Sequence, residues 1–223
     1  NEQIYNQASE GTKVIYALHY AGLIPAGPGK SHQSVRDISL LGALPNITIV
    51  QPASAEETSA FLAWAVEGAD ESVAIRLVIG PSPRRIRFEG ALRVGRGNVL
   101  REGTDGIAFA YGPVMLNELL IAAETLGRRL QVVGMPWLNR IDSAWLADLV
   151  EPFGEIFVIE DHAPVGALAD AIRRALDGRS VTVFGVEGWP VCGTPAEALR
   201  FHGLDGATLA DRIAVVLGTR IRS

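Results

Sequence analysis

The sequence predicts an α/β protein built from two mostly parallel sheets, each covered by helices. Short apolar runs rich in β-branched residues alternate with helical patterns along almost all of the 223 residues. Strands that alternate with helices form parallel sheets, because each helix carries the chain back across the sheet. A stretch rich in arginine, proline and glycine at residues 81–104 interrupts this alternation. We therefore expect a first unit at residues 1–80, a linker at 81–104 and a second unit at 105–223.

The first unit is expected to contain three strands with helices between them. A helical pattern opens the chain, and residues 35–44 carry apolar side chains at helical spacing until Pro45-Asn46 breaks the pattern. Ser54 and Glu57 form a capping box, because a hydroxyl and a carboxylate can accept the free N–H groups at a helix start. The strands are expected at residues 14–18, 47–50 and 73–77.

The second unit repeats the alternation with four strands. Asp142 precedes a helical pattern as its cap, and Thr194 and Glu197 form a second capping box with Pro195 at the first helical position. The strands are expected at residues 106–110, 130–133, 155–159 and 181–184, and the helices at 114–126, 143–150 and 166–176, before two closing helices. Three tryptophans are expected to pack or to lie at interfaces rather than to stack on a ligand: Trp137, Trp145 and Trp189.

The composition excludes several classes of function. The net charge is −5 and no basic stripe is present, which argues against nucleic acid as a partner. No apolar run approaches the roughly 20 residues that a membrane helix needs, so no membrane contact is expected. No signal peptide is visible. The single cysteine, Cys192, excludes an internal disulfide and indicates a cytoplasmic protein.

Two histidines mark the loop after the first strand as a candidate catalytic site. Ligands of open α/β sheets bind beyond the carboxyl ends of strands, where His19 ends a strand and His32 opens a helix. Histidine is well suited to proton transfer near neutral pH, although two structural histidines are the alternative. No third histidine or carboxylate stands at metal-ligand spacing, so no metal site is predicted. The loop also suggests a nucleotide triphosphatase, but that pattern needs glycine where Ile24 stands.

A set of ordered motifs runs from this loop to the next helix. A histidine ends a strand, a glycine-rich loop ends in His-Gln, a Pro-Asn turn precedes a strand that ends in Gln-Pro-Ala, and a helix carries glutamate. The motifs read His19-Tyr20-Ala21-Gly22-Leu23, Gly27-Pro28-Gly29-Lys30-Ser31-His32-Gln33-Ser34, Leu44-Pro45-Asn46-Ile47-Thr48-Ile49-Val50-Gln51-Pro52-Ala53 and Glu56-Glu57. This set resembles the pyrimidine-binding domain of the transketolase-type thiamine diphosphate enzymes. The second unit is similar to that family's C-terminal domain, most closely at Glu160-Asp161-His162, so the resemblance covers nearly the whole chain.

The resemblance implies roles for five residues. His32 matches the loop histidine that faces the thiazolium side of the cofactor and helps to bind and protonate sugar intermediates. His19 matches the strand-end histidine that contacts the substrate near its carbonyl. Arg76 ends the third strand, where the family often places an arginine for the substrate phosphate, and a surface ion pair is the alternative. Lys30 and Ser31 adjoin His32 and are predicted to bind substrate.

Departures from the family limit what the chain is expected to do alone. Pro28 stands where transketolases have an acidic residue that recognises a substrate hydroxyl, so the substrate stays open. The family's catalytic glutamate lies upstream of the helix on which this chain begins, and no Gly-Asp-Gly segment for Mg²⁺ and the diphosphate occurs. We therefore expect the chain to lack the main binding segments for thiamine diphosphate and Mg²⁺ and to be inactive alone. It is expected to work as part of a longer or split enzyme, as a homodimer or with a complementary N-terminal chain.

Several functions stay open at this level. The first is transketolase-like transfer of a carbon unit from a keto-sugar or keto-acid donor. The others are the β subunit of a 2-oxo-acid dehydrogenase and a non-catalytic scaffold or regulatory fragment. The segment at residues 160–162 is expected to form a structural turn, with a site for an anion or a regulatory ligand as the alternative.

Overall fold

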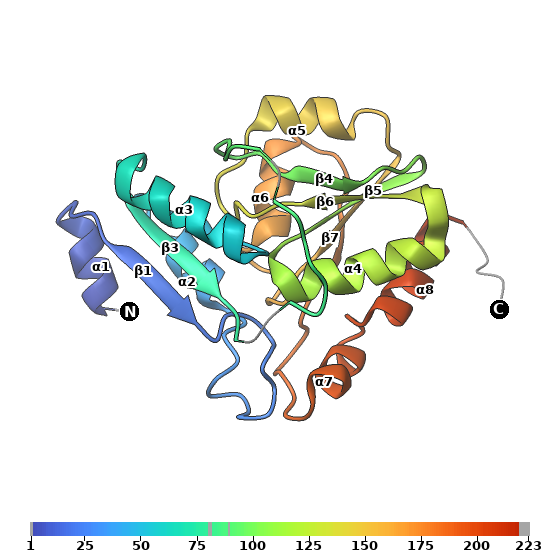
Figure 1. Ribbon diagram of the computed structural model, residues 1–223, viewed down its shortest axis with the longest axis horizontal. Coiled ribbons are helices and arrows are strands. Elements are labelled where there is room, and N and C mark those ends of the chain that lie inside the picture. The colour runs from blue at the N-terminus through green and yellow to red at the C-terminus, as the bar shows by residue number, and fades with distance from the viewer. Residues whose placement is uncertain (1, 80–81, 89, 219–223) are drawn as a thin grey trace.

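The computed structural model describes residues 2–79, 82–88 and 90–218 and contains two sheets covered by helices (Figure 1). The first sheet is parallel, with the order β1-β3-β2, and the second is mixed, with the order β4-β6-β5-β7-β8. The predicted α/β class is therefore confirmed. The strands are β1 (Ile15–His19), β2 (Ile47–Val50), β3 (Ser72–Leu77), β4 (Asn98–Arg101), β5 (Gly106–Ala110), β6 (Leu130–Gly134), β7 (Glu155–Ile159) and β8 (Thr182–Phe184).

The helices begin where the sequence places capping residues. Ser54 accepts a hydrogen bond from the backbone N–H of Glu57, and Asp142 accepts one from that of Trp145. Thr194 forms the predicted capping box with Glu197. The helices are α1 (Glu2–Ser9), α2 (Asp37–Gly42), α3 (Ala55–Glu67), α4 (Gly112–Leu126), a short 3₁₀ turn (Gly127–Arg129), α5 (Ser143–Val150), α6 (Leu168–Ala175), α7 (Pro195–Phe201) and α8 (Gly206–Val216). None of these described helices combines the length and apolar character needed to cross a bilayer.

One strand lies inside the stretch that the sequence predicts to be a linker. β4 occupies one edge of the second sheet and pairs with β6 in antiparallel orientation. Its four residues include only two apolar side chains and end in arginine, so it lacks the continuous apolar run typical of a buried strand. The prediction of irregular structure is therefore wrong for these residues.

The two sheets are joined through a shared core. Trp137, which follows β6, forms an isolated antiparallel bridge with Val50 at the edge of the first sheet. Its ring centre lies 4.9 Å from those of Phe61 and Trp64 on α3, in edge-to-face contacts. Trp137 is fully buried, and apolar residues of both sheets belong to one contiguous cluster. The second unit therefore contributes directly to the core of the first.

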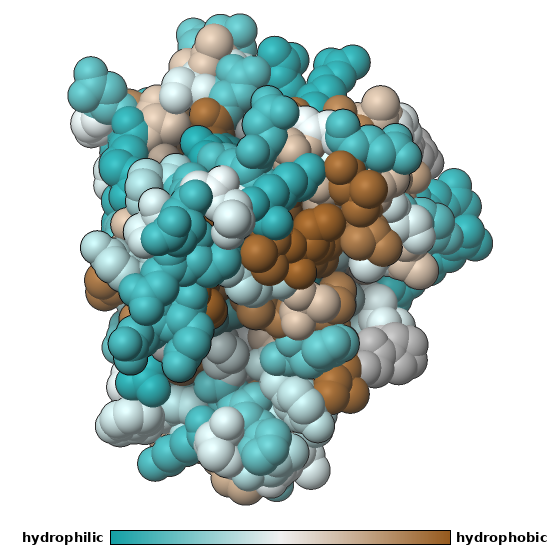
Figure 2. Space-filling model, turned by 90° about the vertical axis from the view of Figure 1, so that its left-hand side faces the viewer, coloured by the Kyte–Doolittle hydropathy of each residue, from teal (hydrophilic) through white to brown (hydrophobic). Residues whose placement is uncertain are grey.

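β1 leaves an open edge on the other side of the first sheet. No described strand pairs with its outer side, and its residues are half-buried or exposed, whereas β2 is buried throughout. Figure 2 shows the side of the molecule that bears α1 and β1, where apolar side chains gather among polar ones. An unpaired strand edge beside apolar surface is a place where a further segment can pair.

Candidate functional site

The candidate site lies at the carboxyl end of β1, where the chain leaves the sheet through the loop to α2. His19 is the last residue of β1, and Tyr20 follows it with φ at 61°. A residue other than glycine rarely adopts this left-handed conformation, and such residues gather at functional sites. The turn directs the chain away from the sheet and places Tyr20 beside His32, with ring centres 5.3 Å apart.

Four of the five predicted site residues share one pocket. A cavity of about 400 Å³ is lined by His19, Lys30, Ser31 and His32, together with neighbours from the same loop and α2. Ser31 Oγ lies 2.9 Å from Nδ1 of His32, so the hydroxyl fixes one side of the imidazole. The other ring nitrogen, Nε2, is then the atom available to a ligand for proton transfer. Among the predicted residues, the structure thus brings together two imidazoles, one hydroxyl and one ammonium group.

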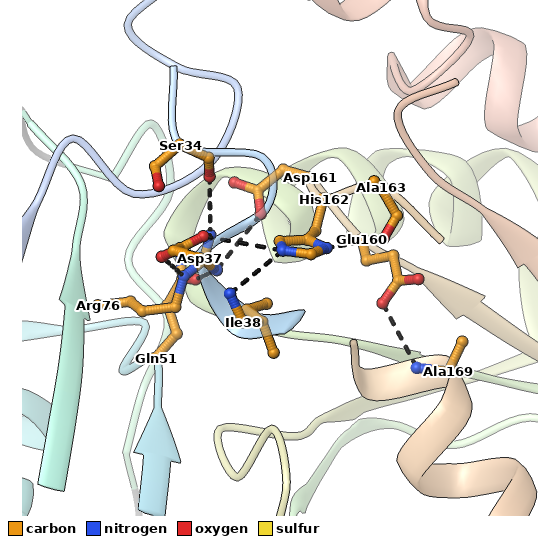
Figure 3. A network of polar contacts seen from close by, with 10 residues as sticks. All are labelled: Ser34, Asp37, Ile38, Gln51, Arg76, Glu160, Asp161, His162, Ala163 and Ala169. Atoms are coloured by element: carbon orange, nitrogen blue, oxygen red, sulfur yellow. Dashed lines mark hydrogen bonds and ion pairs between the residues drawn. The ribbon is translucent and has the colours of Figure 1, made fainter. Parts of the chain in front are cut away.

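Arg76 does not line this pocket and lies instead in a buried polar network (Figure 3). Its side chain is 0% exposed, and its Nε and Nη2 donate to the two carboxylate oxygens of Asp37 over 2.8 and 3.1 Å. Its Nη1 donates to Gln51 and lies 3.7 Å from Asp161. Burial acts to lower the pKa of Arg76, but Asp37 and Asp161 outweigh it, so the pKa lies above its ordinary value. Arg76 is thus part of an ion pair that is buried, and its role towards a substrate phosphate stays a prediction.

The other half of the network comes from the end of β7 in the second unit. Burial raises the pKa of Asp161, against the attraction of Arg76. Burial also lowers the pKa of His162 to about 4, so its imidazole is neutral near pH 7. Nε2 of His162 therefore accepts the N–H of Ile38 at 3.2 Å, while Nδ1 donates to the carbonyl of Ala163 at 2.7 Å. The turn at 160–162 is fully enclosed, which favours the structural role over an open ligand site.

The second unit also holds the loop that carries His32. The buried amide of Gln33 donates to the carbonyls of Leu23 and Val191, each at 3.0 Å. The backbone N–H of Ala163 donates to Val35, and that of Gly193 donates to Ala26. These contacts lie before and after His32 in the chain. The conformation of the histidine loop is therefore set by residues from both units.

Glu160 makes the stability of this region depend on pH. Burial raises the pKa of Glu160 to about 8 and that of Glu57 to about 7. In the unfolded chain both carboxyls lose their protons near their ordinary value of 4.5, so above that pH the folded protein binds more protons. His162 opposes this decline slightly, because its folded imidazole is already neutral while the unfolded one still loses protons just above its ordinary pKa of 6.5. Between pH 6.5 and 8 the free energy of unfolding is therefore expected to fall by about 2 kcal/mol.

Replacing Glu160 with glutamine tests this expectation. Glu160→Gln keeps the shape of the neutral carboxyl and cannot ionise, so more than half of the decline should disappear in urea unfolding at pH 6.5, 7.2 and 8. Glu151→Gln, at an exposed position, is the control and should keep the decline of the unchanged protein. Equal slopes for Glu160→Gln and the unchanged protein would show that Glu160 is already ionised when buried.

Sequence reasoning missed three residues around the pocket. Asp37 pairs with Arg76 from 39 positions away in the chain, and nothing local indicates this. Tyr20 lies between the motif residues, but its aromatic contact with His32 depends on its left-handed backbone. Trp189 is 61% exposed, with Arg36 over its ring, so it does not pack in the core, and its expected place at an interface stays a prediction.

Family profiles match most of the sequence. A profile described as the pyrimidine binding domain of transketolase matches residues 1–78, and one described as the C-terminal domain of transketolase matches residues 95–209. Among curated proteins, the 1-deoxy-D-xylulose-5-phosphate synthase of Treponema pallidum (strain Nichols) is 30% identical over 224 residues, which are 95% of this chain and 35% of that protein. The same-named enzyme of Chlorobium luteolum is 30% identical over 96% of this chain and 35% of its own length. The chain thus spans about a third of the curated relatives that it matches.

Solved structures show the same fold. A structure described as a split gene transketolase, inactive beta4 tetramer, superposes with a TM-score of 0.82 at 27% identity, over 99% of this chain and 73% of that chain. Transketolase from Campylobacter jejuni subsp. jejuni superposes with a TM-score of 0.75 over 96% of this chain and 34% of its own. At 20% identity, this second likeness bears on the fold alone.

Proposed function

The chain belongs to the transketolase family, and we propose that it is the C-terminal portion of a thiamine diphosphate-dependent enzyme that transfers a carbon unit from a keto-sugar or keto-acid donor. The observation that carries the proposal is the pocket shared by His19, Lys30, Ser31 and His32. Two imidazoles at the carboxyl end of a parallel strand, beside a cation, suit the binding and protonation of a carbonyl compound. The 1-deoxy-D-xylulose-5-phosphate synthases among the relatives support the same class of chemistry.

The roles of the pocket residues follow from their surroundings. His32, held at Nδ1 by Ser31, exchanges a proton with a substrate oxygen through Nε2. His19, exposed at the strand end, binds the substrate near its carbonyl. Lys30 supplies positive charge at the pocket, and Ser31 orients His32 and can donate to the substrate.

The residues of this chain are suited to binding the substrate of such an enzyme, and less suited to binding the cofactor. Bound in the complete enzyme, thiamine diphosphate would supply the group that stores the charge when a carbon–carbon bond breaks. Residues 2–79, 82–88 and 90–218 contain no group of three metal-ligand side chains that could hold Mg²⁺. Four acidic side chains of the buried regions already have partners inside the chain: Asp37 and Asp161 contact Arg76, Glu57 accepts the N–H of Ala53, and Glu160 accepts the N–H of Ala169. We therefore assign the binding of Mg²⁺ and diphosphate to segments beyond this chain.

The proposal requires an assembly, either a homodimer or a complex with a complementary N-terminal chain. The open edge of β1, on the side of the molecule where Figure 2 shows apolar side chains gathered, supports a further segment on that side. We place the assembly in the cytoplasm, as the single cysteine and the metabolic substrate class suggest.

Reconstitution tests the function. The chain is mixed with the polypeptide that carries the family's Gly-Asp-Gly segment, and product release is followed with a ketose phosphate and with a 2-oxo acid. Turnover is expected only with both polypeptides, thiamine diphosphate and Mg²⁺ present, and calorimetric titration of the chain alone should show no cofactor binding. Tight binding of thiamine diphosphate to this chain alone would show that the cofactor site is misplaced.

The choice of substrate separates the alternatives. Turnover of the 2-oxo acid alone would identify the β subunit of a 2-oxo-acid dehydrogenase. An assembly that forms but turns over neither substrate would identify a non-catalytic scaffold.

A further inference from the structure

Two cationic side chains line the histidine pocket with their charges uncompensated. Lys30 and Arg36 are exposed, and neither forms an ion pair with a carboxylate of the described residues. Asp37 is the one acidic residue among those that line the pocket, and its carboxylate is already bound by Arg76. The pocket is therefore positively charged, although the chain carries a net charge of −5.

Both cations lie close to the ring of Trp189. Cζ of Arg36 lies 4.7 Å from the centre of the Trp189 ring, and Nζ of Lys30 lies 5.9 Å from it. Both distances lie within the range of cation–π attraction. A guanidinium attracted to an aromatic ring still has N–H groups that can donate to a ligand. Trp189 follows β8, so the second unit contributes to this group.

We propose that Lys30, Arg36 and Trp189 form a subsite that binds one phosphate or carboxylate group of a small molecule in the histidine pocket. A guanidinium edge binds either group through two parallel hydrogen bonds, and an ammonium adds a point charge. The cavity of about 400 Å³ is of the size that holds a small metabolite. Arg76 is enclosed, so Lys30 and Arg36 are the lining cations that such a ligand can reach.

The identity of the ligand rests on the proposed function. If that function holds, the subsite takes the anionic end of the keto substrate, while His19 and His32 face its carbonyl. The binding of a simple anion does not depend on the function, and it can be measured on this chain without turnover.

Titration with inorganic phosphate and with acetate at constant ionic strength tests the subsite. The shift of the indole N–H signal of Trp189 in NMR spectra reports binding, and calorimetry reports it for variants that lack Trp189. Saturable binding of one anion is expected, weakened at least tenfold by Arg36→Gln, Lys30→Gln or Trp189→Leu. Arg174→Gln, an equal change of charge at an exposed position on α6, is the control and should bind as the unchanged protein does.

The two anions distinguish the two chemical classes. Tighter binding of phosphate indicates a phosphate ester, and tighter binding of acetate indicates a carboxylate. The subsite is overturned if neither anion saturates, or if Arg36→Gln binds as well as Arg174→Gln. Because no partner or cofactor is present, either result leaves the turnover test of the proposed function intact.

Discussion

Replacing Arg76 with methionine is expected to lower the free energy of unfolding by about 3–5 kcal/mol. Methionine fills most of the volume but removes the only charge that compensates the partly buried carboxylate of Asp37 and the buried one of Asp161 among the described contacts. A buried charge left without its partner is costly, because neither water nor a counter-charge replaces the lost interaction. Urea unfolding at pH 7 measures the change.

A surface ion pair provides the matched control. Arg84 pairs with Glu124 while both side chains are substantially exposed, so Arg84→Met is expected to cost less than about 1 kcal/mol. Adding Asp161→Asn to Arg76→Met should recover part of the loss, since one of the stranded charges is removed. A loss below about 1 kcal/mol for Arg76→Met would contradict the buried network. In the reconstituted enzyme, a variant that folds normally but has a raised KM for a phosphorylated substrate would instead support the predicted phosphate contact.

Replacing His32 with asparagine is expected to lower kcat/KM of the reconstituted enzyme by a factor of about 10²–10⁴. Asparagine can still form hydrogen bonds at this place, but it cannot exchange a proton near neutral pH. His32 is exposed, so its replacement should leave the free energy of unfolding within about 0.5 kcal/mol of the unchanged protein. A loss of rate without a loss of stability assigns the effect to chemistry.

The other histidines give this prediction its controls. His19→Asn should act mainly on KM, because His19 is assigned to binding near the carbonyl. His202→Asn, at the end of α7 and outside the pocket, should leave the rate unchanged. Equal rates for His32→Asn and the unchanged enzyme would remove His32 from the catalytic group.

Structural features that depend on residues close together in the chain could be predicted from the sequence. Helix caps such as Ser54 and Asp142 act over three positions, and β-branched runs identify buried strands, so most elements were found. β4 was missed because its short edge strand is stabilised by pairing with β6 rather than by its own pattern. The four predicted residues of the histidine pocket lie within 14 positions of one another, from the end of β1 through the following loop, so a local motif is enough to group them, while their roles stay predictions.

Long-range contacts explain what the sequence did not reveal. The bond from Ile38 to His162 joins residues 124 positions apart, and nothing in either segment specifies the other. Arg76 illustrates the same limit, because an arginine at the end of a strand can face a ligand or the interior. Its partner Asp161 comes from the other unit, so only the folded arrangement identifies the ion pair.

The position of Trp137 restricts how this chain can be recombined with its relatives. A crossover in the arginine-rich stretch would separate Trp137 from Val50 and from the rings of Phe61 and Trp64. A chimera that takes its halves from two relatives must therefore match both sides of this contact, or it will bury a tryptophan against an unsuited surface. For this reason, the smallest module that can be exchanged consists of both units with their common core, although the sequence pattern indicates two separate units.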